Sequence, residues 1–273
     1  MNLKYFRLIM GAYLTFHFCS LISYAEELFG NQMPFDPTLS PTYHIFPNIL
    51  SHVNARPFII FLSFVSLLFT FGIGHCLCPL ILWYGWAALL NRNVLIHNPG
   101  IPYIGWILFA CAILSITTSN SSYQKNNNYF KRMFSSDMEK NISQNILIMA
   151  WILMGLGYTI SGLHKLQCPS WIDGTALIHI LNGPIARDNF IRDFMISLPP
   201  IFLKISAWGS LGLEILFLPL GMFYHTRFPF WIAYMVFHIG VLLMINFTDL
   251  TLGVMMIHFF TFDERWLRQY GIA

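Results

Sequence analysis

Charged residues are scarce in this chain. Lysine, arginine, aspartate and glutamate make up 10% of its 273 residues, whereas a soluble globular domain carries roughly 25%. Apolar residues make up 56%, and the mean hydropathy is +0.59. Such a chain does not have enough polar side chains to cover a water-soluble fold. The composition therefore excludes a large soluble domain.

Several functional signatures are missing as well. The net charge is only +3 and the basic residues are scattered, so nucleic acid is not expected as a partner. Cys76-x-Cys78 has no second cysteine pair after it, so no zinc or other metal site is expected. The five cysteines fit better as small apolar residues of helices. No Ser-His-Asp order, phosphate-binding glycine loop, HExxH or EF-hand pattern supports a hydrolase, nucleotide or metal function.

Long apolar runs are what the chain has instead. Most measure about 16 to 23 residues, long enough to cross about 30 Å of hydrocarbon as helices. They lack the alternation of barrel strands. We therefore predict an all-α fold, a polytopic transmembrane helical bundle of about eight spans that forms a single domain over residues 1–273. The predicted spans are about 5–24, 57–74, 76–91, 101–118, 144–166, 201–223, 228–247 and 249–262.

The ends of these runs carry further predictions. Tyr5–Tyr24 has no A-x-A-like cleavage pattern, so we predict a retained span rather than a signal peptide. Only Gly72, Gly74 and His75 interrupt the second and third runs, which predicts a tight hairpin. The third and eighth runs are short enough to be partial crossings.

Positive residues set the expected orientation, because cytoplasmic loops carry more of them. With the N-terminus inside, nine of the 15 basic residues are cytoplasmic. They are Lys4, Arg7, Lys125, Lys131, Arg132, Lys140, Arg227, Arg265 and Arg268. We therefore expect a multi-pass protein with both termini in the cytoplasm. The many Asn, Lys and Ile residues are typical of AT-rich bacterial genomes, so the expected location is a bacterial inner membrane.

Three segments between the spans have distinct compositions. Residues 118–145 are rich in Ser, Asn and Lys, and we predict a flexible cytoplasmic connector. Residues 25–56, with the amphipathic run Tyr43–Val53, and residues 170–200 mix aromatic with polar residues. We expect both of these to form short interfacial helices on the outer side of the membrane.

Few ionisable residues lie within the predicted spans, where a charge costs at least about 2.5–3.5 kcal/mol. Lys165 ends the fifth span. Its spacing puts it on one helical face with Tyr158 and Ser161 or Gly162, while His164 lies on the next face. Lys165 is either a functional base or a lysine whose long stem reaches the headgroups.

The sixth and seventh spans supply the other candidates. Glu214 is in the middle of the sixth span, with no other charge within several residues. His238 and Asn246 are eight residues apart, which predicts one face of the seventh span. Glu214 is either a buried hydrogen-bonding residue or a proton carrier, and His238 either a satisfied core histidine or a proton relay. Five other histidines look structural or interfacial: His17, His75, His179, His225 and His258.

The segment Tyr158–Leu177 carries a resemblance to a known family. It has an aromatic residue, a small pair, a basic pair ending in Lys165-Leu, and then Trp171-x-Asp173-Gly. In this it resembles the core motif of vitamin K-dependent gamma-carboxylases and of their bacterial relatives, the HTTM-domain membrane proteins. Phe237-His238 to Asn246, the later Phe262-Asp-Glu-Arg-Trp266 run, and Arg7-x-x-x-Gly11 are weaker matches.

This resemblance implies a function. The family's lysine base, which deprotonates vitamin K hydroquinone, falls on Lys165, and the nearest counterpart of its other catalytic histidine is His97. Reduced vitamin K or menaquinone is then the expected cofactor. The carboxylases also carry a large lumenal part that holds their peptide substrate, and this chain has no such segment after its last predicted span.

Two hypotheses follow for a pocket between spans five, six and seven. In the first, a quinone- or lipid-dependent enzyme uses Lys165, His238 and His97 as catalytic residues, because a desolvated lysine is a usable general base. Tyr158, Ser161, His164, Trp171, Asp173, Glu214 and Asn246 are then its pocket residues. In the second, the chain is a non-catalytic component that binds a hydrophobic or secreted peptide for maturation or export. Membrane lipids are partners in either case, and a transporter is less favoured because no inverted repeat is found.

Overall fold

The computed structural model describes residues 3–30, 53–123 and 144–269, except for the side chains of residues 116–123 and 268. Within these ranges every regular element is a helix, and one isolated antiparallel bridge joins Ala186 and Ile245. The all-α prediction is confirmed. The chain divides into two compact units, Met1–Ser143 and Gln144–Ala273.

In the part of the first unit that the structure describes, four helices are long and three are short. The long helices are α1 (Leu3–Leu21), α3 (Ala55–Phe71), α4 (Leu77–Arg92) and α5 (Gly100–Tyr123). The short ones are η1 (Ile22–Tyr24), α2 (Ala25–Phe29) and η4 (Val94–Ile96). Helix α1 packs along α3, and α4 packs against both α3 and α5.

Close helix contacts and glycines determine how the helices of this unit pack. Gly11 of α1 lies against Thr70 of α3, where an added Cβ would come within 2.3 Å of the threonine hydroxyl. The predicted hairpin between α3 and α4 is confirmed, and Gly72 ends α3 with a φ of 77°, which favours glycine. Arg92, at the end of α4, donates hydrogen bonds to the carbonyls of Phe29 and Gly30. It thereby satisfies the carbonyls at the end of α2.

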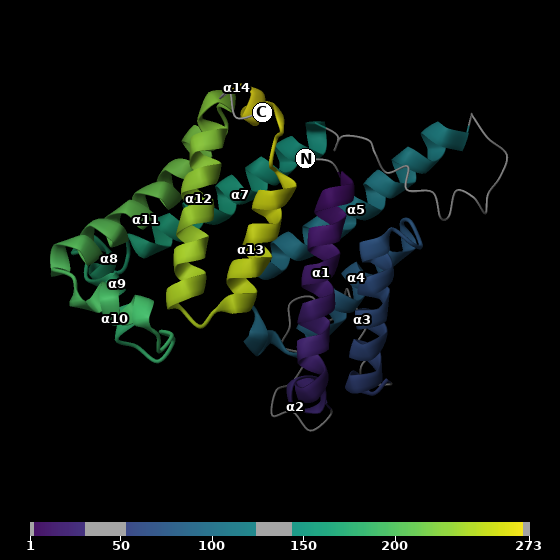
Figure 1. The fold of residues 1–273 in the computed structure, drawn as a ribbon, viewed down its shortest axis with the longest axis horizontal. Coiled ribbons are helices and arrows are strands. Elements are labelled where there is room, and N and C mark those ends of the chain that lie inside the picture. The colour runs from purple at the N-terminus through teal and green to yellow at the C-terminus, as the bar shows by residue number, and fades with distance from the viewer. Residues whose placement is uncertain (1–2, 31–52, 124–143, 270–273) are drawn as a thin grey trace. The chain divides into compact units, whose positions relative to one another are not determined.

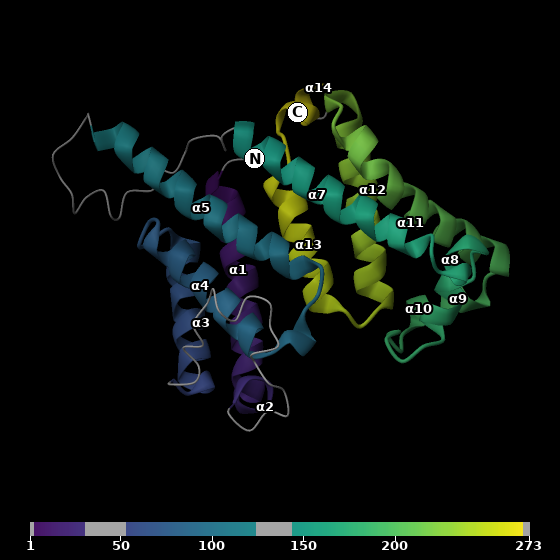
Figure 2. The same cartoon turned by 180° about the vertical axis from the view of Figure 1, so that it is seen from behind.

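The second unit contains eight helices within the described residues. The longer ones are α7 (Gln144–Lys165), α11 (Pro200–Gly221), α12 (Tyr224–Met244) and α13 (Thr248–Phe260). The shorter ones are α8 (Pro169–Ile172), α9 (Ala176–Leu181), α10 (Phe190–Ser197) and α14 (Arg265–Gln269). Helix α11 packs along α7, and α12 lies beside α13 (Figure 1). Figure 2 shows the same pairs from behind.

Small residues let α7 and α11 approach closely, as in many membrane helix pairs. Gly155 lies against Leu218, and Gly162 lies against Glu214 and Ile215. Between the two glycines, the hydroxyl of Thr159 faces the backbone of α11.

Thr159 compensates for a backbone hydrogen bond that α11 lacks. Pro219 has no N–H, so the carbonyl of Ile215 loses the donor it would have in a regular helix. The Thr159 hydroxyl donates to the carbonyls of Glu214 and Ile215, at 3.2 and 3.4 Å, and accepts from the N–H of Leu218. A side chain of α7 therefore completes the backbone of α11, which hydrocarbon makes necessary.

Four helical segments in the described part of the chain are long and apolar enough to cross a membrane: Leu3–Phe29, Gln144–Lys165, Pro200–Gly221 and Tyr224–Met244. Three shorter apolar helices accompany them: Ala55–Phe71, Gly100–Ser115 and Thr248–Phe260. The structure thus supports a multi-pass helical membrane protein. The full set of eight crossings and the sidedness of the short helices stay predictions.

Some expectations concern residues that the structure does not describe. The amphipathic run Tyr43–Val53 falls almost entirely there, and so does most of the connector 118–145. The segment 170–200 does contain the short helices α8, α9 and α10. One expectation is wrong: α12 ends at Met244 and Ile245 is extended, so Asn246 does not share a helical face with His238.

Candidate functional site

The ammonium of Lys165 pairs with the carboxylate of Glu214. Lys165 is the last residue of α7 and Glu214 is about 21 Å along α11 from its first residue, at 1.5 Å per residue. Lys165 Nζ lies 2.5 Å from Glu214 Oε1, and the side chains are 24% and 6% exposed. Glu214 Oε2 is buried and accepts no hydrogen bond from a described residue. The ammonium of Lys165 is therefore paired with a buried carboxylate whose second oxygen is not hydrogen-bonded to any described residue.

Trp171 covers the lysine. Lys165 Nζ is 4.5 Å from the centre of the Trp171 ring, an attractive cation–π distance. Trp171 lies on α8, which begins with Pro169 after a three-residue turn that follows the end of α7. Aromatic surface on one side and a carboxylate on the other leave the ammonium half-buried.

The following turn explains the Asp-Gly part of the motif. Asp173 Oδ1 accepts hydrogen bonds from the hydroxyl and the N–H of Thr175, and these bonds lower the pKa of Asp173 below its ordinary value. Gly174 has a φ of 80°, and an added Cβ would lie 3.0 Å from atoms of Lys204 and Trp208 on α11. The turn therefore needs glycine both for its backbone conformation and for space.

A second polar group lies two helical turns before Lys165. Tyr158 Oη is 2.6 Å from Nε2 of His238 on α12 and 2.7 Å from Nε2 of His258 on α13. A phenol has one proton, so Tyr158 donates to one imidazole and accepts from the other. The two Nδ1 atoms are buried and have no hydrogen-bond partner among the described residues.

Aromatic rings enclose this group. The ring of Tyr158 is 4.2 Å from that of Tyr234 and 5.0 Å from that of Phe217, between centroids. Tyr234 also stacks on His258 at 5.4 Å. Each buried polar atom without a partner costs about 1–3 kcal/mol. Three helices thus hold a tyrosine and two histidines at an energetic disadvantage, which favours a functional role.

The other expected pocket residues do not join these contacts. Ser161 is half-buried and His164 is exposed. Asn246 is exposed, and its backbone N–H donates to the carbonyl of Ile185. Asp173 stabilises its own turn, as described above. His97 belongs to the first unit, where it is exposed and follows η4.

His258 was expected to be structural or interfacial, and the structure shows it fully buried and hydrogen-bonded to Tyr158. The signal that isolates His238, an ionisable residue in an apolar run, applies equally to His258. The described residues contain no group of three or more His, Cys, Asp or Glu side chains that could hold a metal ion.

No family model, curated protein or solved structure matches this chain. The interpretation of the site therefore rests on its own geometry and on the resemblance at Tyr158–Leu177.

Proposed function

We propose that this chain is a carboxylase-like membrane enzyme that acts on a reduced quinone, or on a similar lipid with an acidic hydroxyl group. The observation that carries the proposal is the pairing of Lys165 with Glu214, whose second carboxylate oxygen has no hydrogen-bond partner among the described residues. The resemblance of the surrounding segment to vitamin K-dependent carboxylases points to the same lysine.

The residues around Lys165 suit such a ligand. A reduced quinone supplies a planar ring with weakly acidic hydroxyl groups, and its anion is the electron-rich species that reacts with oxygen. Trp171 offers a flat apolar surface next to the ammonium. Glu214 Oε2 offers a buried acceptor for a hydroxyl proton.

The pair itself determines where the proton goes. An ammonium has no lone pair, so Lys165 accepts a proton only after it has passed one to Glu214. This transfer removes both charges of the buried pair together. Neutral Lys165 then takes the hydroxyl proton. The result is an anionic ligand beside a lysine ammonium, with Glu214 protonated.

His238 and His258 act as a second proton station in this proposal. Tyr158 links them through its single hydroxyl. When one imidazole gains a proton at its bare Nδ1, the phenol proton shifts and the other imidazole releases one. We propose that this exchange accepts the proton left on Glu214 and so returns the catalytic pair to its resting state. We also propose that the chain is a multi-pass protein of the bacterial inner membrane with both termini in the cytoplasm.

The competing hypothesis is a non-catalytic component that binds a hydrophobic or secreted peptide. It is favoured by the apolar surface of α10, where Phe190 is 82% and Phe194 53% exposed. These two rings stack at 6.5 Å and lie on a short helix that follows the motif segment. In this hypothesis Lys165 has no role in turnover.

The test compares wild type with two lysine variants in lipid nanodiscs, supplied with reduced menaquinone or vitamin K in oxygenated buffer. Quinone binding and epoxide formation are both measured. We expect Lys165→Ala to lower turnover by about 100-fold or more, in line with loss of a general base. Lys204→Ala is the matched control, since Lys204 is on α11 ahead of Glu214 and forms no ion pair within the described residues, and we expect it to retain activity.

Binding of quinone without epoxide in all three proteins contradicts the carboxylase-like chemistry. Absence of both binding and epoxide contradicts the proposal as a whole. The next experiment is then crosslinking of a peptide to α10 in wild type and in Phe190→Ser, which tests the competing hypothesis.

A further inference from the structure

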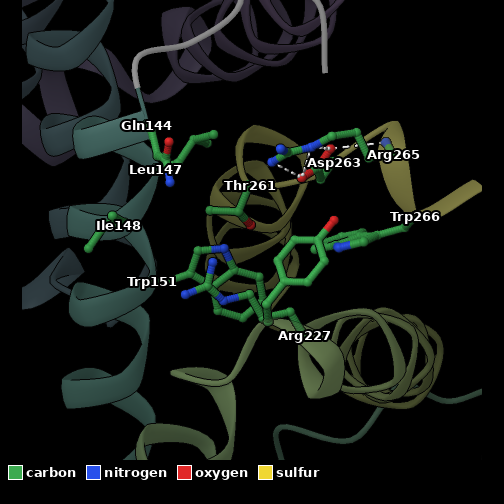
Figure 3. A pocket seen from close by; sticks show the side chains of 10 residues that line it. Gln144, Leu147, Ile148, Trp151, Arg227, Thr261, Asp263, Arg265 and Trp266 are labelled. Atoms are coloured by element: carbon green, nitrogen blue, oxygen red, sulfur yellow. Dashed lines mark hydrogen bonds and ion pairs between the residues drawn. The ribbon is translucent and has the colours of Figure 1, made fainter. Parts of the chain in front are cut away.

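A partly open cavity of about 460 Å³ lies at the other end of α7 from Lys165. Its walls come from the starts of α7 and α12, the end of α13, and α14. The lining residues are Gln144, Leu147, Ile148, Trp151, Tyr224, Arg227, Thr261, Asp263, Arg265 and Trp266. In Figure 3, Gln144, Leu147 and Ile148 lie on the α7 side, and Trp266 points in from α14.

The cavity carries a positive charge. Among the described residues that line it, the charged ones are two arginines and one aspartate. Asp263 is already neutralised, because Arg265 donates to both of its carboxylate oxygens at 2.6–3.0 Å. One arginine charge, that of Arg227, is left for a ligand.

Two groups of hydrogen-bond donors are available to that ligand. Arg227 uses Nε and Nη2 on the carbonyls of Gly221 and Met222, and its Nη1 donates to no described residue. Trp266 is 1% exposed, and its indole N–H is buried without a partner among the described residues. Two donors without acceptors in one cavity indicate an anionic ligand.

The aromatic residues of the cavity restrict the class of ligand further. Arg227 lies over the ring of Trp151 at 5.3 Å, and Arg265 lies over that of Tyr224 at 5.7 Å. A guanidinium group therefore covers one face of each of these two rings. The rings do not offer an aromatic cage for a choline-type cation.

The position fits a lipid headgroup. α7 and α12 are two of the helices able to cross a membrane, and both begin at this cavity. Tryptophan and tyrosine gather where such helices enter the bilayer. Basic pockets between membrane helices bind the phosphates of anionic lipids. We propose that this cavity is a binding site for the phosphate of an anionic phospholipid, held by Arg227 and the indole N–H of Trp266.

The experiment measures thermal unfolding and native mass spectra of the purified full chain in neutral detergent. Phosphatidylglycerol, phosphatidylcholine with the same acyl chains, and inorganic phosphate are added separately. We expect phosphatidylglycerol at saturation to raise the Tm of wild type by about 5 °C or more and to remain bound in the spectra. The other two additions should have little effect.

Three variants locate the effect. Arg227→Gln and Leu147→Trp, which fills the cavity without a change in charge, should each lose most of the phosphatidylglycerol shift. Arg56→Gln makes the same charge change at an exposed position of the first unit and should keep the shift. If Arg227→Gln does not fold, Leu147→Trp carries the test.

Each contrary result overturns the proposal. Equal stabilisation by both lipids excludes recognition of the negative charge. A full shift with inorganic phosphate alone excludes the lipid as the source. An undiminished phosphatidylglycerol shift in a folded Arg227→Gln or Leu147→Trp protein excludes this cavity as the site.

Discussion

Removal of Lys165 alone should damage the protein more than removal of Lys165 and Glu214 together. Lys165→Met leaves the carboxylate of Glu214 buried without its counter-charge, and loss of one partner of a buried pair costs about 3–5 kcal/mol. Because the Lys165 side chain is 24% exposed, water relieves part of this penalty, and we expect about 2–3 kcal/mol.

The double variant Lys165→Met/Glu214→Leu replaces the pair with apolar side chains of similar length. It should recover most of the stability of wild type, since exchange of a buried ion pair for apolar groups is often neutral or better. The coupling energy between the two positions should then be about 2 kcal/mol. No such recovery is expected when Glu214→Leu is combined with Lys204→Met.

Thermal unfolding in detergent, followed by circular dichroism, measures the cycle. At roughly 2–4 °C per kcal/mol for a chain of this size, Lys165→Met should lower the Tm by about 5–10 °C. A coupling energy within about 0.5 kcal/mol of zero refutes the reasoning, because independent sites add to within that margin. It would mean that Lys165 stabilises the protein through contacts other than its ion pair with Glu214.

Three further outcomes are expected. Tyr158→Phe removes the hydroxyl that joins the two buried histidines, and should lower stability by about 2–4 kcal/mol in the same unfolding assay; an unchanged Tm contradicts the hydrogen bonds. Gly162→Ala brings a Cβ within 2.9 Å of α11 and should cost about 1–3 kcal/mol, whereas Gly209→Ala, with open space around it, should be nearly neutral. Burial alone would raise the pKa of Asp263, but hydrogen bonds from the side chain and backbone of Arg265, and its charge, lower it. A carboxyl group with a lowered pKa stabilises the fold above its unfolded pKa of about 4 and loses that effect as pH falls further, so Asp263→Asn should flatten the acid limb of a Tm–pH curve. The effect should be under about 1 kcal/mol, because the Arg265 side chain is 69% exposed and water screens its charge, although Asp263 is only 16% exposed. An identical acid limb in the variant refutes this.

The helices themselves were largely predictable from the sequence. The segment predicted at 144–166 is the helix Gln144–Lys165, and the expected hairpin turn begins at Gly72. Hydropathy and glycine act locally, so a single sequence reveals them. The end of α12 at Met244 was missed because the apolar run continues through Ile245, and nothing in its composition marks the change to extended backbone.

The candidate site was predictable only in part. Lys165 and Glu214 stand out because each is a charge in an apolar run, yet 49 residues separate them, and their pairing depends on how α7 packs on α11. The partners of Tyr158 are 80 and 100 residues away. Residues that meet through tertiary packing share no spacing signal, so a sequence identifies the candidates but not their contacts.

The contact of Thr159 with α11 also limits how the second unit can move. This hydroxyl replaces the backbone N–H donor that Pro219 lacks. A slide or rotation of α7 along α11 would therefore leave the carbonyls of Glu214 and Ile215 without this hydrogen-bond donor in hydrocarbon. The two helices are thus expected to travel as one rigid body. Any opening of the unit would fall to α12 and α13, whose connection at Ile245 is extended backbone, and a hinge there would have to break the bridge between Ile245 and Ala186. Since His238 and His258 are on those two helices and Tyr158 is on α7, such a hinge motion would pull the histidines away from the phenol and interrupt proton exchange while the unit is open.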